Sequence, residues 1–156
     1  MSKSVNRVKA YAEAAGLPID IKRMGESTRT AEEAARQCGC SVAQIVKSLI
    51  FEGETSAKLY LFLVSGVRQL DLAKAAGLVG ETLKRADPKR IREETGFAIG
   101  GVSPLGQPDG VPRYGDESLL GFDVVWAAAG AHNAVFSAEP QTLFRAAKVQ
   151  AADLVA

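Results

Sequence analysis

The sequence has few of the side chains that bind metals or form disulfides. Its 156 residues include one histidine and two cysteines. The cysteines, Cys38 and Cys40, flank a single glycine, so a disulfide between them would close a very small and strained ring. With only His132 to add, the chain lacks the Cys/His set of a structural zinc site, and no spaced cluster of carboxylates stands out. We therefore expect neither a metal nor another cofactor.

Long apolar runs and an excess of charge of one sign are also missing. The longest apolar run, Val124 to Ala129, is too short to cross a bilayer, and residues 1–11 lack the apolar stretch of a signal peptide. A net charge of +1 gives no sequence-wide footprint for coating a nucleic-acid duplex, although a local contact with one end of an RNA stays open. These absences predict a cytoplasmic protein with no membrane partner, and the length of the chain predicts one domain over residues 1–156.

Apolar periodicity and capping signals predict helices interleaved with hairpin-like strands. The expected helices cover residues 5–15, 31–38, 42–44, 72–77, 88–95 and a last segment that begins at Pro140, with a single turn at 117–120. Strands are expected at 19–21, 47–51, 59–65, 97–99, 122–129 and 134–137, and residues 107–115 are expected to form an exposed excursion. This order indicates an α+β (mixed α/β) fold in which helices flank one curved, mixed, mainly antiparallel sheet.

The stretch from Gly96 to Gly106 is the most unusual part of the chain. It holds four glycines and one proline in eleven residues. Glycine allows positive φ and close approach to another group, whereas proline fixes φ and removes a donor. Phe97 to Ile99 would be a short strand that leads into a loop, and such a loop can present backbone N–H and C=O groups to a ligand. A tight turn with a bulge is the alternative interpretation.

Two familiar catalytic motifs are excluded at this stretch. A nucleophile elbow at Ser103 would need a glycine where Leu105 stands, and an oxyanion-hole N–H from Pro104, which has none. The spacing of Gly101 and Gly106 fits a P-loop, but Gln107-Pro108 stands where that motif requires Lys-Ser/Thr. Neither a serine hydrolase nor a P-loop nucleotide site is predicted.

Two other polar residues could face a ligand. Lys47 lies within the nearly apolar segment Ile45–Phe51, so its ammonium must reach an anion, a carbonyl or water. A lysine that extends to the surface at a helix–strand junction is the alternative. His132 lies in an expected turn, Gly130–Asn133, where local hydrogen bonding and a ligand-facing role are both open. The basic stretch at 84–92 is interleaved with acidic residues and is interpreted as a solvated face, with RNA-backbone binding as the alternative.

Four segments taken together resemble the YbaK/ProX family, the stand-alone relatives of the editing domain inserted in bacterial prolyl-tRNA synthetase. The segments are residues 30–35, 45–49, 96–106 and 129–133, and in this order and spacing they cover nearly the whole chain. The resemblance implies a compact α/β fold around a curved mixed sheet. It also implies metal-free hydrolysis of an amino acid wrongly esterified to a tRNA, most often the proline tRNA.

Site residues follow from the same resemblance. The pocket lysine of the family maps to Lys47, its Gly-x-x-x-Pro loop to Gly100–Pro104 and its later glycine turn to Gly130, so Lys47, Gly100 and Gly130 are expected to be catalytic. The expected substrate-binding residues are Thr30, Ser48, Gly101, Val102, Ser103, Pro104, Ala131, His132 and Asn133. In the family the loop backbone is thought to hold the terminal adenosine and the ester, while the ribose hydroxyl of the tRNA assists the attacking water.

Backbone N–H groups and one cation suffice for this chemistry, which needs a stabilised oxyanion and a well-placed water. The implied partners are the 3′ aminoacylated end of a tRNA and, as a further candidate, prolyl-tRNA synthetase. We expect the edited amino acid to have a small side chain, such as alanine or 2-aminobutyrate. The alternative is a non-catalytic module that binds aminoacyl-tRNA or a synthetase.

Overall fold

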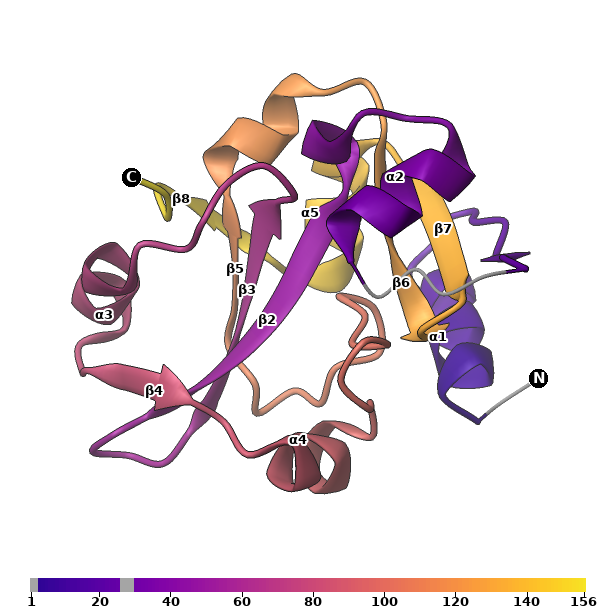
Figure 1. Cartoon of the computed structure of the whole chain (residues 1–156). Helices are drawn as coiled ribbons and strands as arrows, with labels where there is room; N and C mark the ends of the chain where they lie inside the picture. The colour runs from indigo at the N-terminus through magenta and orange to yellow at the C-terminus, as the bar shows by residue number, and fades with distance from the viewer. Residues whose placement is uncertain (1–2, 26–29) are drawn as a thin grey trace.

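Residues 3–25 and 30–156 are described by the computed structural model, in which the strands form two sheets (Figure 1). The strands are β1 (Lys22–Arg23), β2 (Val46–Gly53), β3 (Leu59–Ser65), β4 (Leu83–Arg85), β5 (Arg113–Asp116), β6 (Val125–Ala131), β7 (Ala134–Ala138) and β8 (Gln150–Ala152). The α-helices are α1 (Lys3–Ala14), α2 (Ala31–Cys38), α3 (Leu72–Val79), α4 (Pro88–Thr95) and α5 (Pro140–Ala147). Two short 3-10 helices, η1 (Val42–Gln44) and η2 (Glu117–Gly121), complete the described elements.

The larger sheet has the strand order β4-β2-β3-β5-β8, and the smaller has the order β1-β7-β6. Pairing is antiparallel in the smaller sheet and between β2 and its neighbours, whereas β3–β5 and β5–β8 are parallel. A parallel bridge between Ile45 and Trp126 joins the two sheets. The expected α+β class with mixed, mainly antiparallel pairing is confirmed, and the strands divide into two sheets where the sequence indicated one.

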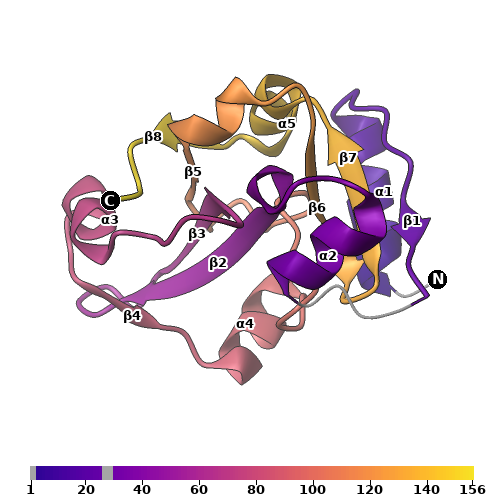
Figure 2. The same cartoon turned by 45° about the horizontal axis from the view of Figure 1, so that its top comes forward.

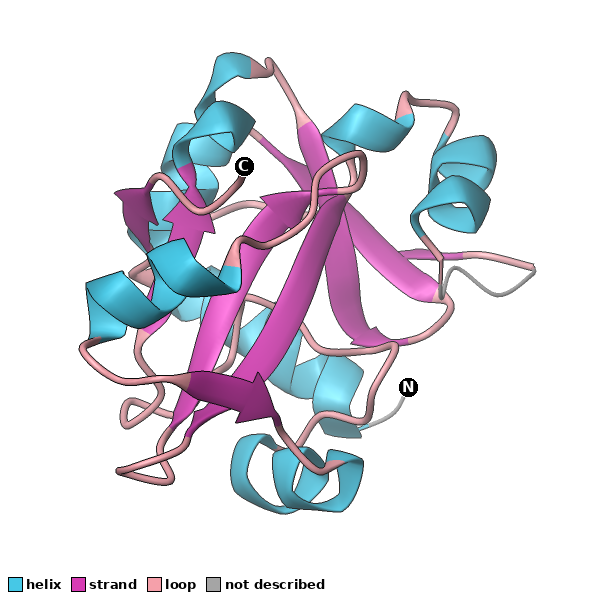
Figure 3. Ribbon diagram, turned by 60° about the vertical axis from the view of Figure 1, so that its left-hand side comes forward, coloured by secondary structure: helices cyan, strands magenta, loops and turns pink. Residues whose placement is uncertain are grey.

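Helices cover the outer faces of both sheets (Figure 3). Helices α1 and α2 lie on opposite faces of the smaller sheet, one behind and one in front of the β6–β7 hairpin (Figure 2). The alternation of β6 explains this, because Ala127 and Ala129 pack into the main core with α1, while Trp126 packs beside Ala34 of α2. Strand β3 is buried along its whole length and forms the centre of the larger sheet. No described helix has both the length and the apolar character of a membrane span.

Capping residues place most helix ends where the sequence predicts them. Thr30 Oγ1 accepts a hydrogen bond from the Glu33 N–H at 3.1 Å, and Gly39 ends α2 with a φ of +70°. The Asp87 side chain caps α4, Pro88 occupies its first turn, and Gly96 ends it in the left-handed region. These predictions of helices are confirmed.

Several predicted strands and one predicted helix end are wrong. Pairing with β7 begins at Lys22 instead of Ile19. Residues 97–99 form part of a loop and not a strand, although Phe97 is fully buried. Gly130 belongs to β6, so the turn is confined to His132 and Asn133. Helix α3 also continues past Gly77 to Val79, with Gly80 as its left-handed cap.

The stretch 107–115, expected to be exposed, contains a buried arginine. Arg113 is 7% exposed and donates to the carbonyl oxygens of Val111, Ala147, Gln107 and Pro108. These bonds satisfy the guanidinium inside the protein and draw the stretch inward, where residues 113–116 form β5 between β3 and β8. Periodicity does not reveal such a strand, because a charged residue begins it.

Candidate functional site

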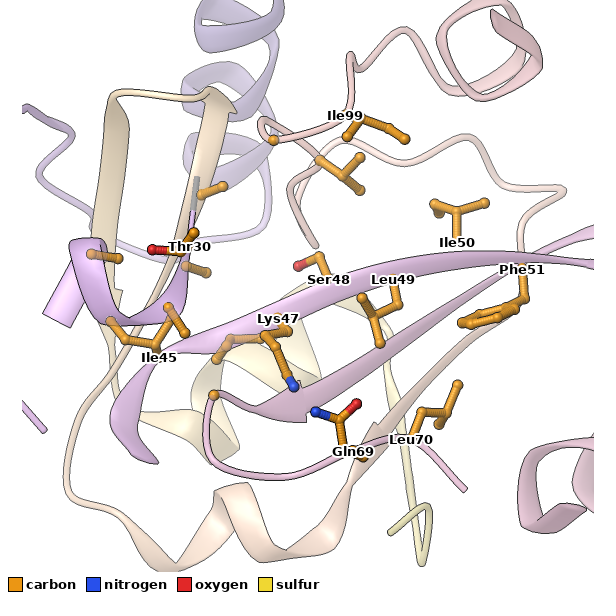
Figure 4. Close-up of a pocket in the computed structure, with 18 of the residues that line it drawn as sticks. Thr30, Ile45, Lys47, Ser48, Leu49, Ile50, Phe51, Gln69, Leu70 and Ile99 are labelled. Atoms are coloured by element: carbon orange, nitrogen blue, oxygen red, sulfur yellow. The ribbon is translucent and has the colours of Figure 1, made fainter. Parts of the chain in front are cut away.

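A cleft of about 1030 Å³ opens along the edge of β2 that faces away from β3 (Figure 4). Strand β4 pairs with this edge only from Phe51 to Gly53, and β6 reaches it through the bridge at Ile45. Among the described strands, none pairs with this edge between Val46 and Ile50. The two sheets therefore diverge here and leave a length of strand edge open to a ligand.

The backbone of Ser48 faces this cleft. Ile45 O accepts from the Gly66 N–H and the Gly53 N–H donates to Lys58 O, so the odd-numbered residues of β2 bond toward β3. Successive strand residues direct their backbone groups to opposite edges. The N–H and C=O of Ser48 accordingly point away from β3, into the open length of the edge.

Side chains of β2 divide the cleft into two parts. The loop side is formed by Ser48, Ile50 and Ile99, which lie on the same side of the strand (Figure 4). The lysine side is formed by Lys47, Leu49, Phe51, Gln69 and Leu70 (Figure 4). A ligand that crosses the strand edge would therefore meet a hydroxyl group on one side and a cation on the other.

Lys47 is partly buried on its side of the cleft. Its Nζ donates a hydrogen bond to Arg68 O, in the connection that follows β3. Burial lowers the pKa of the Lys47 ammonium, and the negative charge of Glu32 on α2 opposes this shift. The lysine therefore reaches a carbonyl at the cleft wall, one of the three partners that its apolar surroundings predicted.

Ser48 presents a second polar atom to the cleft. Its Oγ is buried and has no hydrogen-bond partner among the described residues. A buried hydroxyl without a partner costs free energy, so such groups are normally satisfied. Ser48 Oγ is therefore an unsatisfied polar atom just beneath the surface of the cleft.

Glycines fit the loop after α4 against the smaller sheet. Gly100 has a φ of +92° and lines the cleft. A Cβ on Gly101 would lie 3.0 Å from the Ala131 backbone, and one on Gly130 would lie 2.7 Å from Ser4 O. Gly101 thus lets the loop lie on β6, while Gly130 lets β6 approach α1.

A family model for the aminoacyl-tRNA editing domain matches residues 25–146. The chain belongs to the aminoacyl-tRNA editing domain family. The family that the four sequence segments indicated is thereby confirmed. The editing domain is an aminoacyl-tRNA deacylase, which hydrolyses the ester of mischarged tRNA.

Three similar proteins extend this assignment. A crystal structure of a proposed trans-editing enzyme for prolyl-tRNA synthetase matches with a TM-score of 0.91 at 48% identity, over 100% of this chain and 99% of that one. The proposed Cys-tRNA(Pro)/Cys-tRNA(Cys) deacylase EbsC of Enterococcus faecalis is 25% identical over 130 residues, 83% of this chain and 79% of EbsC. The proline–tRNA ligase of Thermosipho melanesiensis is 38% identical over 81 residues, which are 51% of this chain and 14% of the ligase.

Five of the predicted site residues of the editing domain line the cleft. They are Thr30, Lys47, Ser48, Gly100 and Val102. Lys47 and Ile99, the residue before Gly100, lie on opposite sides of β2 (Figure 4), so the strand edge separates the predicted cation from the predicted loop. Any shared action on one substrate must therefore take place across the edge, at Ser48.

The other predicted residues are not among those that line the cleft: Gly101, Ser103, Pro104, Gly130, Ala131, His132 and Asn133. Ser103 is fully buried, and its Oγ accepts from the Leu105 N–H at 3.2 Å. Asn133 Oδ1 accepts from Arg23 at 3.3 Å, which ties β1 to the β6–β7 turn. His132 is exposed in that turn. Within this group, Gly101 packs against the backbone of Ala131, and Gly130 packs against Ser4 of α1.

Sequence reasoning missed several lining residues. Phe51 and Gln69 lie on the lysine side, while Ala127 and Ala128 of β6 complete the wall. The alternation of Lys47, Leu49 and Phe51 along β2 is a signal that could have found the phenylalanine. The sequence gives no comparable signal for Gln69, because polar residues are common in the segments that connect strands and helices.

Backbone groups, the Ser48 hydroxyl and the Lys47 ammonium are the polar groups that β2 brings to this cleft, and Thr30, Glu32, Gln69 and Arg85 also line it. No cluster of three or more His, Cys, Asp or Glu side chains in residues 3–25 and 30–156 is placed to hold a metal ion. The arrangement suits the binding of an ester carbonyl and the stabilisation of a developing oxyanion.

Proposed function

We propose that this editing domain deacylates tRNA-Pro that carries a small non-cognate amino acid, with alanine and 2-aminobutyrate as the preferred substrates. The observation that carries the proposal is the unpaired edge of β2 at Ser48, flanked by Lys47 on one side and the Gly100 loop on the other. The likeness to a proposed trans-editing enzyme for prolyl-tRNA synthetase supports the choice of tRNA and of a synthetase as partner. We expect the reaction in the cytoplasm, where the synthetase acts.

The ester crosses the strand edge in this proposal. The aminoacyl group occupies the loop side, where Ile50, Ile99 and Val102 offer apolar surface to a short aliphatic side chain. Burying one methyl or methylene group is worth about 0.8 kcal/mol, whereas an unpaired polar side chain would be penalised. Apolar lining thus favours alanine and 2-aminobutyrate over serine.

Hydrolysis proceeds by attack of water on the ester carbonyl. The water oxygen bonds to the carbonyl carbon, and the carbonyl oxygen becomes an oxyanion that the Ser48 N–H and the Lys47 ammonium stabilise. The bond between that carbon and the ribose oxygen then breaks, and the ribose oxygen takes up a proton. The products are the free amino acid and tRNA with both terminal hydroxyl groups. The neighbouring ribose hydroxyl assists the water, as the family resemblance implies.

Release of labelled amino acid from a panel of charged tRNAs tests this proposal. The panel contains tRNA-Pro carrying alanine, 2-aminobutyrate, cysteine, serine or proline, together with alanine on its own tRNA. We expect the alanyl and 2-aminobutyryl esters of tRNA-Pro to be hydrolysed fastest and Pro-tRNA-Pro to be spared. Preferential release of cysteine, as the description of EbsC suggests for that protein, would overturn the choice of amino acid. Tight binding without release would favour the non-catalytic module.

A further inference from the structure

Beside Lys47, the cleft has an apolar surface that the ester chemistry does not use. Leu49, Phe51 and Leu70 lie together on the lysine side (Figure 4). They pack against a buried cluster that includes side chains of β3, among them Phe62. The Phe51 ring meets the edge of Phe62 at 6.2 Å between centroids, with 64° between the ring planes. Since this surface rests on buried residues, it is a preformed support for a flat apolar ligand.

Gln69 is a polar residue at the rim of this surface, and Arg85 of β4, which is opposite Phe51 in the register, is another. Gln69 is exposed, it lines the cleft, and its amide has no hydrogen-bond partner among residues 3–25 and 30–156. In Figure 4 its amide and the Lys47 ammonium point toward one another. A glutamine amide offers one donor and one acceptor side by side.

The chain on both sides of Gln69 is fixed. Lys47 Nζ binds Arg68 O, and the Arg68 N–H donates to Ser65 O at 2.9 Å. On the other side, Leu70 forms an antiparallel bridge with Val155, and the Asp71 N–H donates to Leu154 O at 2.7 Å. The amide of Gln69 is thus carried by an ordered backbone, which lowers the entropy lost when it binds a ligand.

We propose that the lysine side of the cleft binds the adenine base of the terminal nucleotide, and that Gln69 reads the N6 and N7 edge of that base. This inference rests on the proposed function, because the ester of an aminoacyl-tRNA is carried by a 3′-terminal adenosine. Adenine presents an N6 amino donor beside the N7 acceptor, and a glutamine amide matches both. Its flat face lies against apolar or aromatic side chains, as unstacked bases do in many RNA-binding proteins.

This placement puts the aminoacyl group and the adenosine of the substrate on different sides of β2. With the aminoacyl group on the loop side, the adenosine emerges across the strand edge on the lysine side, which differs from the family resemblance, where the loop backbone holds both the adenosine and the ester. Lys47 lies on the same side of β2 as the base site, where its ammonium can meet the negative charge of the terminal phosphate. Two halves of one ligand thus occupy two sides of one strand.

The 3′-O-alanyl esters of adenosine 5′-monophosphate and inosine 5′-monophosphate test whether Gln69 recognises the base. Inosine keeps N7 but replaces the N6 donor with an O6 acceptor, so the glutamine amide cannot match both atoms. We expect wild type to prefer the adenosine ester by about five- to 150-fold in kcat/KM, the range of one bidentate base contact. Gln69→Leu should bring the ratio close to one, and Gln69→Lys should favour inosine, because lysine donates to O6 and N7.

Gln141→Leu is the matched control, because Gln141 is an exposed glutamine on α5 that does not line the cleft. It should keep the wild-type ratio. Equal rates on the two esters in wild type, or an unchanged ratio in Gln69→Leu, would overturn the inference.

Binding of the two free nucleotides separates this inference from the deacylase proposal. If neither ester is hydrolysed, the proposed substrate fails, yet titration with AMP and IMP still reports on the base site. We expect tighter binding of AMP, lost in Gln69→Leu and kept in Gln141→Leu. Equal affinity for the two nucleotides would refute the adenine site whatever the activity.

Discussion

Lys47 and Ser48 are neighbours in the sequence, yet their side chains lie on opposite sides of β2 (Figure 4). The sequence marks Lys47 because one cation stands in an apolar segment, and it marks Ser48 only through the family resemblance. What neither signal conveys is that no described strand pairs with the edge of β2 at Ser48. That property depends on where β4 and β6 stop pairing with β2, which is set by tertiary structure.

Replacing Lys47 with methionine tests the role of its charge. Methionine keeps much of the aliphatic stem, so packing should be retained while the ammonium is lost. We expect the single-turnover rate of deacylation to fall by about a hundred- to thousandfold, the usual effect of removing one oxyanion-stabilising group. The melting temperature should change little, and Lys89→Met on the exposed face of α4 serves as the control. A Lys47→Met rate within a few-fold of wild type would leave the backbone to stabilise the oxyanion alone.

Ser103→Ala tests whether a serine nucleophile takes part. Ser103 is fully buried, and Pro104 lacks the N–H that an acyl-enzyme would need. Loss of the bond from the Leu105 N–H should cost about 1 kcal/mol of stability, measurable by denaturant unfolding. We expect deacylation to stay within about tenfold of wild type, because the serine only supports the loop. An acyl-enzyme trapped on Ser103 and detected by mass spectrometry would contradict this expectation.

Helix α1 supports the loop that forms one wall of the cleft. Arg7 Nη2 donates to Thr95 O at 2.5 Å, and its guanidinium carbon lies 4.2 Å from the centroid of the Phe97 ring. Ser4 Oγ also donates to Gly96 O at 3.2 Å. The first turns of α1 thereby hold the start of the loop, while Gly101 fits its middle against β6.

Arg7→Leu should loosen this loop without unfolding the protein. A cation–π contact at an exposed site is worth about 0.5–1 kcal/mol, so the loss of stability should be small. We expect faster amide hydrogen exchange at residues 98–102 and a lower deacylation rate, whereas Lys9→Leu on the same helix should change neither. Unchanged exchange at 98–102 in Arg7→Leu would show that α1 does not position the loop.

At the level of elements, the sequence predicts helices better than strands. Caps such as Thr30 and Asp87 act through bonds to the next few residues, so local sequence specifies them. By contrast, β4 and β8 are three residues long with little apolar pattern, and they exist because a neighbouring strand pairs with them. Strand β5 begins with the buried Arg113, one of whose carbonyl partners, Ala147 O, comes from a residue far along the chain.

Across the whole molecule, the cleft results from two sheets that join at one bridge and then separate. The family resemblance indicates the activity and five of the lining residues, since a motif specifies residue types and their order. It does not indicate the adenine site, which depends on how the connection after β3 returns to β2. Gln69 enters the cleft only because Lys47 and the C-terminal residues fix that connection.

Hydrolysis of Ala-tRNA-Pro by a variant with a blocked cleft tests the central claim most directly. Ala128 lines the cleft and is only partly buried, so a phenylalanine there should occupy the space of the ligand. Because displacement of a substrate by about 1 Å can cost a hundredfold, we expect Ala128→Phe to lose at least about that factor in rate. Ala10→Phe, on the exposed face of α1, should retain the wild-type rate. If folded Ala128→Phe hydrolyses Ala-tRNA-Pro as fast as wild type, the ester is not cleaved in this cleft.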